Sequence, residues 1–302
     1  MYIGGIKLNF LSISDFTETQ IGEIFQLTDH LQTHGGIELL EGKTFALFFP
    51  DSSLRTRITF EKGIKQLGGD CLLFPSESLD KREKLEDVIQ YMENWVDGVI
   101  VRHPDFSKLQ ELSKHASIPI INAMTSENHP CEILSDLYSI RKIRSNYTEL
   151  VYTFVGPANN ISKSWMEIAK VLNLNFNHVC VKGYELGEET PNYKFHTNLE
   201  NTLGISDIVL TDSLPQILRT DEYIANYQIS LERMNLAKQQ AVLNPCPPFF
   251  RNEEVSEDVI SSDYFVGHHF KKNLLYVQQA VILYCMGITS GTDMLLKLAL
   301  YR

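Results

Sequence analysis

The stretch FFPDSSLRTR at residues 48–57 largely determines the fold expected for this chain. It follows an apolar strand that begins at Thr44, and the apolar residues after it are spaced as in an amphipathic helix. A strand that turns into a helix directs unpaired backbone N–H groups and the positive end of the helix dipole at the turn. Ser53 and Thr56 place hydroxyl groups on either side of Arg55, so the turn is suited to a phosphate dianion. Taken alone, the stretch also fits an ordinary surface helix start with scattered arginines.

Two later strands end in residues that suit the same chemistry. The segment GVIVRHP ends in Arg102, and the segment IPIINAM leads through Thr125 to His129 and Glu132 at the start of a new helix. Three parallel strands with phosphate-compatible groups at their carboxyl ends are typical of the ligand-binding crevice of an open α/β sheet. The sequence therefore predicts an anion site at this edge of a parallel sheet.

With these motifs in this order, the chain resembles the aspartate/ornithine carbamoyltransferase family. The family pattern is Ser-Thr-Arg-Thr-Arg, then Arg-His-Pro or Arg-Gly, and then His-Pro-x-Gln. The resemblance extends nearly from end to end. It is carried by LEDVIQYMENWVDGVIVRHP (85–104), INAMTSENHPCEILSDLYSI (121–140), FVGPANNISKSWMEIAKVL (154–172), LTDSLPQ (210–216) and LNPCPPFFRNEEVSEDVI (243–260).

Composition limits the classes of protein that the chain can belong to. Its 302 residues, 43% hydrophobic and 22% charged, suffice for two globular domains. A net charge of −11 argues against general nucleic-acid or anionic-membrane binding, and no segment approaches the length of a membrane span. Five cysteines without a CxxC pair favour reduced thiols in a cytoplasm. Nine histidines without a close cluster predict neither a metal site nor a cofactor.

Helical and short apolar segments alternate along the chain, which favours an α/β class. We expect strands near 44–49, 71–74, 98–102, 118–122, 150–156, 178–181, 207–210 and 241–244. The resemblance implies two doubly wound parallel-sheet domains, joined by two long helices, with the active site in the cleft. The first domain would cover residues 1–146 and be completed by a C-terminal helix over 271–302. The second would cover residues 147–270 and bind the acceptor.

The resemblance also implies which residues act on carbamoyl phosphate. The binding residues would be Ser53, the Leu54 backbone, Arg55, Thr56, Lys81, Arg102, His129, Glu132, Cys246 and Pro247. Among them Arg55, Arg102, His129 and Cys246 would be catalytic, because fixed donors stabilise the charge that develops on oxygen as an amine attacks. His129 has a simpler interpretation as a locally satisfied histidine at a helix start.

Three residues expected at the carbamoyl phosphate site depart from the family pattern. Leu54 replaces a threonine, which costs little if only the backbone N–H binds phosphate. Glu132 replaces a glutamine and brings a negative charge toward a dianion. Leu274 replaces an arginine, and the loss of one charge-assisted hydrogen bond costs about 1.5–3 kcal/mol unless Lys271 or Lys272 substitutes for it.

The segment SESLDKREKLED matches the family loop that reaches into the active site of a neighbouring subunit. Lys81 and Arg82 would carry positive charge into that site, or else begin a solvated charged helix. A shared loop implies a homo-oligomer, and the family expectation is a homotrimer with active sites shared between subunits.

Charged and polar residues of the second predicted domain indicate which kind of amino acid accepts the carbamoyl group. Aspartate requires arginines for its second carboxylate, whereas ornithine requires a carboxylate for its second amine. Asp212 stands where aspartate enzymes have an arginine, and Asn160 matches the residue of ornithine enzymes that binds the amino-acid carboxylate region. Cys246 aligns with a cysteine near the attacking amine. Simpler interpretations are a core thiol for Cys246 and a turn cap for Asp212.

Two hypotheses of different classes follow. The first is an enzyme that moves a carbamoyl group from carbamoyl phosphate to the amine of an ornithine-like amino acid, with aspartate or another amine as alternative acceptors. The second is a catalytically weakened member that binds a ligand, which the departures at Glu132 and Leu274 motivate. The retention of Ser53, Arg55 and Thr56 favours the enzyme. The sequence leaves open whether it serves arginine synthesis or citrulline breakdown.

Overall fold

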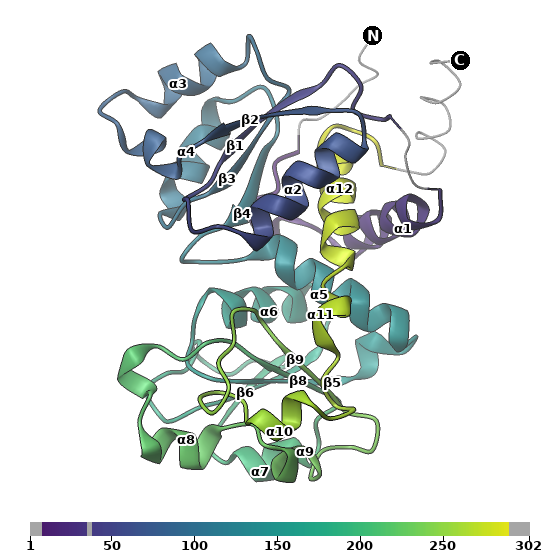
Figure 1. Ribbon diagram of the computed structural model, residues 1–302, viewed down its shortest axis with the longest axis vertical. Coiled ribbons are helices and arrows are strands. Elements are labelled where there is room, and N and C mark those ends of the chain that lie inside the picture. The colour runs from purple at the N-terminus through teal and green to yellow at the C-terminus, as the bar shows by residue number, and fades with distance from the viewer. Residues whose placement is uncertain (1–7, 35–37, 290–302) are drawn as a thin grey trace. The chain divides into compact units, whose positions relative to one another are not determined.

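The computed structural model describes residues 8–34 and 38–289, which form two compact units (Figure 1). Unit 1 comprises residues 1–138 and 272–302, and unit 2 comprises residues 139–271. The chain passes from unit 1 to unit 2 within α5 (Pro130–Ile143) and returns just before α12 (Asn273–Cys285). Residues 290–302 of the predicted C-terminal helix lie outside the described residues.

Unit 1 is built on a parallel sheet with the strand order β2-β1-β3-β4 in its described part. Its strands are β1 (Thr44–Phe48), β2 (Asp70–Phe74), β3 (Gly98–Arg102) and β4 (Ile120–Met124). The two central strands are apolar nearly throughout, as strands covered on both faces must be, and β1 pairs with β3 from Phe45–Gly98 to Phe48–Val101.

Helices cover both faces of this sheet. The helices are α1 (Glu18–His34), α2 (Arg55–Gln66), α3 (Leu85–Met92) and α4 (Phe106–His115), with short 3-10 turns η1 (Ile13–Asp15) and η2 (Ser76–Asp80). α3 and α4 pack on one face against Ala46, Phe48, Val99 and Val101. α1, α2 and α12 lie side by side on the other face (Figure 1), where the Gln279 amide donates to the Gly63 carbonyl at 2.8 Å.

Unit 2 contains a second parallel sheet, in the order β7-β6-β5-β8-β9. Its strands are β5 (Val151–Val155), β6 (Asn175–Val179), β7 (Tyr193–His196), β8 (Ile208–Thr211) and β9 (Val242–Pro245). Its helices are α6 (Asn160–Val171), α7 (Leu199–Leu203), α8 (Asp221–Tyr227), α9 (Leu231–Met234), α10 (Glu257–Ile260) and α11 (Gly267–Phe270), with η3 (Tyr147–Glu149) and η4 (Gln216–Leu218). α7, α9 and α10 pack on one face, and α6 lies on the other (Figure 1), where the Trp165 ring packs at a tilt against the Tyr152 ring.

The predicted α/β class with two parallel-sheet domains is confirmed, and each of the eight predicted strands is present. β4 ends later than predicted, at Met124, and β6 begins earlier, at Asn175. β7 was not predicted, because the four residues YKFH are too few for their alternating polarity to distinguish an edge strand from a loop. Among the described residues, no helix is both long and apolar enough to cross a membrane.

His178 joins two elements in the core of unit 2. Its Nε2–H donates to the Gly156 carbonyl at 2.6 Å, and its Nδ1 accepts from the Tyr193 hydroxyl at 3.2 Å. The Tyr193 oxygen in turn accepts from the Leu186 backbone N–H at 3.0 Å. This arrangement fits a neutral imidazole, and burial lowers the pKa of His178 to about 4.

We predict that the free energy of unfolding falls as the pH drops from about 6.5 toward 4. In this range the unfolded chain binds a proton at His178 and the folded chain does not, so folding is disfavoured by up to about 1.4 kcal/mol per pH unit. Above pH 7 the group contributes no pH dependence. Urea unfolding of the wild type and His178→Gln should show a smaller loss at low pH in the variant. His269→Gln, which changes an exposed histidine of unit 2, serves as the control and should leave the pH profile unchanged.

Candidate active site

The strand order of unit 1 reverses between β1 and β3. From β1 the chain proceeds outward to β2, and then it returns to the other side of β1 to form β3 and β4. Ligands of open parallel sheets bind at the carboxyl ends of the strands on either side of such a reversal. Ser53, Arg55 and Thr56 follow β1, and Arg102 ends β3, so the predicted phosphate residues lie at this point.

The N-terminus of α2 is suited to an anion. Leu54 at the N-cap makes no side-chain hydrogen bond to the helix within the described residues, and the first turn is Arg-Thr-Arg-Ile. The positive charges of arginines at this end of a helix are repelled by the positive end of the helix dipole. A bound anion, by contrast, is attracted by the arginines and by the dipole. The Ser53 hydroxyl is buried and has no hydrogen-bond partner among the described residues, although buried hydroxyls are nearly always paired.

A hydrogen bond joins the end of β3 to α2, the helix that follows β1. The Arg102 Nη1 donates to the Thr56 Oγ1 at 3.1 Å. Thr56 is buried, whereas Arg55 at the start of α2 is exposed. The Arg102 guanidinium is therefore held by α2, the helix that also carries Arg55. This bond fixes the position of Arg102 before any ligand binds.

A network of amides positions His129, which directly precedes α5. The Thr125 Oγ1 donates to the Asn128 Oδ1 at 2.9 Å, and the Asn122 Nδ2 donates to the same oxygen at 2.6 Å. His129 is buried, and Glu132 is buried in the first turn of α5. The positive end of the helix dipole stabilises a carboxylate at that position, so the departure to glutamate has a local compensation.

Other predicted residues of unit 1 are not part of this cluster in the single chain. Lys81 and Arg82 follow η2 and are exposed. The Leu54 side chain is 65% exposed, so only its backbone is suited to contact an anion in the described chain. Leu274 is buried in the first turn of α12, while Lys272 beside it is exposed. A leucine therefore occupies an apolar position at the site of the expected arginine.

Unit 2 has its own reversal, between β5 and β8. Asn160 begins α6 after β5, Asp212 follows β8, and Cys246 follows β9. The Thr211 Oγ1 donates to the Val155 carbonyl at 2.7 Å, and the Cys246 N–H donates to the Thr211 carbonyl at 2.8 Å. These bonds join the ends of the three strands, and so the predicted acceptor residues emerge from adjacent positions on one sheet edge.

Asp212 is held by the residue that caps α6. The Asn159 Nδ2 donates to the Asp212 Oδ2 at 2.9 Å, while the Asn159 Oδ1 accepts from the Ser162 N–H at 2.9 Å. Asp212 itself is half-buried, so its carboxylate is both oriented and accessible. Cys246 is buried and Pro247 half-buried, with a cis peptide bond between Pro247 and Pro248.

Sequence reasoning missed several residues that position the site. Asn122 and Asn128 are separated by six residues in a segment with no regular polarity pattern. Asn159 could have been found, because an asparagine followed three residues later by a serine before an apolar periodic segment is typical of a helix start. Its contact with Asp212, 53 residues away, could not be predicted from any local sequence pattern.

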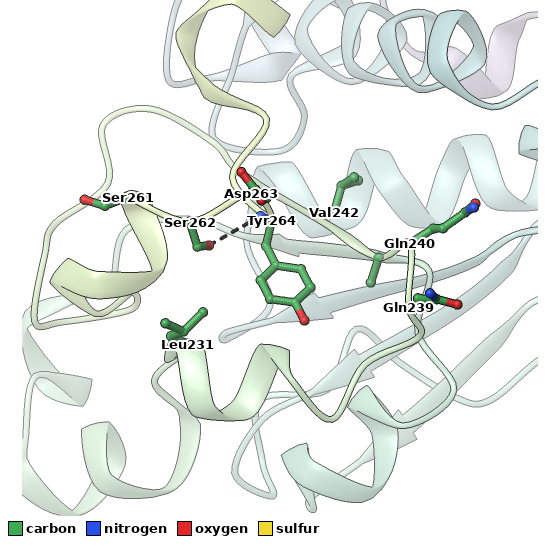
Figure 2. Close-up of a pocket in the computed structure, with 9 residues that line it drawn as sticks. Leu231, Gln239, Gln240, Val242, Ser261, Ser262, Asp263 and Tyr264 are labelled. Carbon is green, nitrogen blue, oxygen red and sulfur yellow. Dashed lines mark hydrogen bonds between the residues drawn. The ribbon is translucent and has the colours of Figure 1, made fainter.

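The hollow in Figure 2 lies away from these residues. It has a volume of about 610 Å³ beside Val242, the first residue of β9, and is lined among others by Leu231, Gln240 and Tyr264. Cys246 follows the opposite end of the same strand. The lining contains none of the predicted site residues, so the hollow is not part of the acceptor site.

Comparison with known proteins gives the same result for both units. Residues 8–142 match the family domain described as "Aspartate/ornithine carbamoyltransferase, carbamoyl-P binding domain", and residues 148–285 match "Aspartate/ornithine carbamoyltransferase, Asp/Orn binding domain". The ornithine carbamoyltransferase of Carboxydothermus hydrogenoformans is 31% identical over 304 residues, covering 92% of this chain and 97% of the relative. That of Desulfotalea psychrophila is 31% identical over 293 residues, covering 90% and 96%.

Solved structures agree with these relatives. The ornithine carbamoyltransferase of Burkholderia thailandensis superposes with a TM-score of 0.86 at 27% identity, covering 94% of this chain and all of that one. The enzyme of Pyrococcus furiosus superposes with a TM-score of 0.87 at 25% identity, covering 95% and 99%. Both domain matches assign the chain, a carbamoyltransferase, to the aspartate/ornithine carbamoyltransferase family.

Proposed function

We propose that this carbamoyltransferase transfers the carbamoyl group of carbamoyl phosphate to the amine of an ornithine-like amino acid and releases phosphate. The observation that carries the proposal is the carboxylate of Asp212 at the reversal of unit 2, where a second amine of the acceptor would be neutralised. Relatives named ornithine carbamoyltransferase, matched over most of the chain, support the same acceptor.

The phosphate group would bind at the N-terminus of α2. Ser53, the Leu54 backbone, Arg55 and Thr56 would contact its oxygens, and the buried Ser53 hydroxyl gains the partner that it lacks among the described residues. Arg102 and His129 would donate to the carbonyl oxygen and stabilise its charge as the tetrahedral centre forms. Glu132 would accept from the carbamoyl amine group, and Lys81 would add positive charge from a neighbouring subunit.

The acceptor would be held by unit 2. Asn160 would bind its carboxylate region and Asp212 its charged end, and Cys246 with Pro247 would line the path of the attacking amine. The neutral amine forms a C–N bond to the carbamoyl carbon, the C–O bond breaks with its electron pair going to the oxygen of the departing phosphate, and the proton that the amine loses is taken up by that phosphate. The chemistry needs neither a metal nor a cofactor.

The units would divide these tasks as their family domains do. Residues 1–146 with 271–302 would bind carbamoyl phosphate, and residues 147–270 would bind the acceptor, the matching descriptions being carbamoyl-P binding and Asp/Orn binding. Among the described residues none of the five cysteines forms a disulfide, which supports a reducing compartment such as the cytoplasm. Amino-acid and arginine metabolism is the corresponding pathway class.

A homotrimer is the proposed working unit, with active sites shared between subunits. β2 is the outer strand of its sheet in the described residues, and Leu72, Leu73 and Phe74 in it are all exposed. Ile58 on the adjacent α2 is exposed as well. An apolar edge strand of this kind favours association with another chain, and monomeric proteins usually protect such an edge with charged residues.

We predict that Arg55→Ala weakens carbamoyl phosphate binding by about 10- to 150-fold, because one charge-assisted hydrogen bond is lost. Isothermal titration with carbamoyl phosphate, or with phosphate as a competitor, measures the change. Lys62→Ala removes an exposed charge from the same helix and should stay within about twofold of the wild type. Unchanged affinity in Arg55→Ala would contradict the assignment of the phosphate site.

Asp212→Asn should retain the hydrogen bond from Asn159 and lose only the negative charge. We expect use of an ornithine-like acceptor to fall by about 100-fold or more, while carbamoyl phosphate affinity changes by less than about twofold. Phosphate release is measured with ornithine, acylated ornithines, lysine, putrescine and aspartate. Asp263→Asn, an exposed aspartate at the other end of the sheet, is the control. Turnover of the wild type with aspartate alone would overturn the acceptor class.

We expect light scattering to give the wild type a mass of about three times 34.5 kDa. Leu73→Glu should shift the protein toward the monomer, because a charge would be buried at the interface. Ile205→Glu, which alters an exposed isoleucine of unit 2, should leave the mass unchanged. Mixed oligomers of Arg55→Ala and Lys81→Ala subunits should regain activity if the sites are shared, and a failure to do so with intact trimers would contradict sharing.

A further inference from the structure

Two segments carry the proposed acceptor residues of unit 2. Asp212 begins the segment that follows β8, and Cys246 begins the segment that follows β9. Backbone bonds fix the two residues where the strands end, with Thr211 paired to Pro245. Beyond that point the segments leave the sheet, and side chains must hold them against each other.

Arg219, at the end of the first segment, reaches the second one. Its Nε lies 3.1 Å from the Glu253 Oε2 and donates to the Leu214 carbonyl at 3.0 Å. Its guanidinium also lies over the Phe250 ring, 5.5 Å from the centroid. The planar guanidinium thus contacts a carboxylate, a backbone carbonyl and an aromatic face, which together define one geometry.

Glu254 lies beside this ion pair and is buried. Its Oε1 accepts from the Phe250 N–H, and the Gln228 Nε2 donates to the neighbouring Glu253 carbonyl at 3.0 Å. Burial raises the pKa of Glu254, while the backbone N–H groups of Phe250 and Leu214 oppose that shift by favouring the charged form. A buried carboxylate therefore faces the backbones of both segments.

We propose that Arg219, Glu253 and Glu254 form an acceptor clasp, a set of positioning residues that holds the segment bearing Asp212 against the segment bearing Cys246. The proposal rests on the acceptor roles proposed above for Asp212 and Cys246. No clasp residue needs to touch the substrate, because the clasp acts by keeping the two segments in one arrangement before the acceptor binds.

The exposure of the ion pair separates this role from a purely structural one. The side chains of Arg219 and Glu253 are 41% and 28% exposed, and ion pairs of that kind contribute little to stability. The clasp lies wholly in unit 2, whereas the proposed phosphate contacts of Arg55 and Arg102 belong to unit 1. Breaking the clasp therefore raises the KM of the acceptor and leaves the affinity for carbamoyl phosphate unchanged.

The same segment supplies a matched control. Arg251 pairs with Glu257, its Nε lying 3.2 Å from the Oε1, and the side chains are 48% and 66% exposed. This pair connects Arg251 to α10 and does not join the segment after β8. Arg251→Met removes an ion pair of the same kind, two residues from Glu253, without opening the clasp.

The experiment measures acceptor KM, kcat and carbamoyl phosphate affinity for Arg219→Met, Glu253→Gln, the double variant, Arg219→Lys and Arg251→Met. We expect an acceptor KM about tenfold higher in each single clasp variant and no further increase in the double variant, since both remove one interaction. Arg219→Lys should restore part of the loss, because lysine pairs with Glu253 without the planar contacts. Arg251→Met should stay within about twofold.

Hydrogen exchange of residues 212–219 gives a readout that does not depend on turnover. Exchange should be faster in Arg219→Met and Glu253→Gln than in the wild type and Arg251→Met. Additive effects, an unchanged acceptor KM in active Arg219→Met, or unchanged exchange would each overturn the clasp. A wild type that uses none of the acceptors would instead overturn the proposed reaction, and the exchange data would still decide whether the clasp holds the segment.

Discussion

Parallel pairing at the two points of strand reversal determines where the candidate site residues lie. In unit 1 the pairing of β1 with β3 brings the carboxyl ends of these strands together, and in unit 2 the pairing of β5 with β8 does the same. Because each strand of a parallel sheet is followed by a crossover, the neighbours at a reversal send their connecting segments to opposite sides. The ends of those strands are left open, and Arg55, Arg102, Asn160 and Asp212 occupy them.

Electrostatics then separates the tasks of the units. The chain as a whole carries a charge of −11, so long-range attraction does not draw a dianion to it. In the proposed reaction the attraction would be local instead, from the start of α2, the arginines around it and the buried hydroxyl of Ser53. Unit 2 presents a negative charge instead, the Asp212 carboxylate, whose Oδ2 accepts a hydrogen bond from the Asn159 Nδ2 at 2.9 Å. In the proposed reaction, an anionic donor and a cationic acceptor would thus be matched to different sheets of one chain.

Pre-organisation is the common feature of the contacts around both edges. Thr56 holds Arg102, the amides of Asn122 and Asn128 hold the turn before His129, and Asn159 holds Asp212. Such bonds restrict polar side chains before substrate arrives, which lowers the entropic cost of reaching a reactive geometry. The proposed clasp extends the same principle from single side chains to two segments of the backbone.

The sequence by itself determined the fold class and every strand of the two described sheets except β7, because strand polarity is a local property, and the helix start at residues 53–56 led to the prediction of a phosphate site there. It also indicated the charge of the acceptor through Asp212. Only the tertiary structure decided which side chains hold these groups: Thr56 on Arg102, Asn159 on Asp212 and Arg219 near Glu253. Their partners are 46, 53 and 34 residues apart in sequence, and contacts between such positions arise from sheet pairing and helix packing, which no local pattern encodes. The edge strand β7 and the burial of Leu274 were decided in the same way, by neighbours that are distant along the chain.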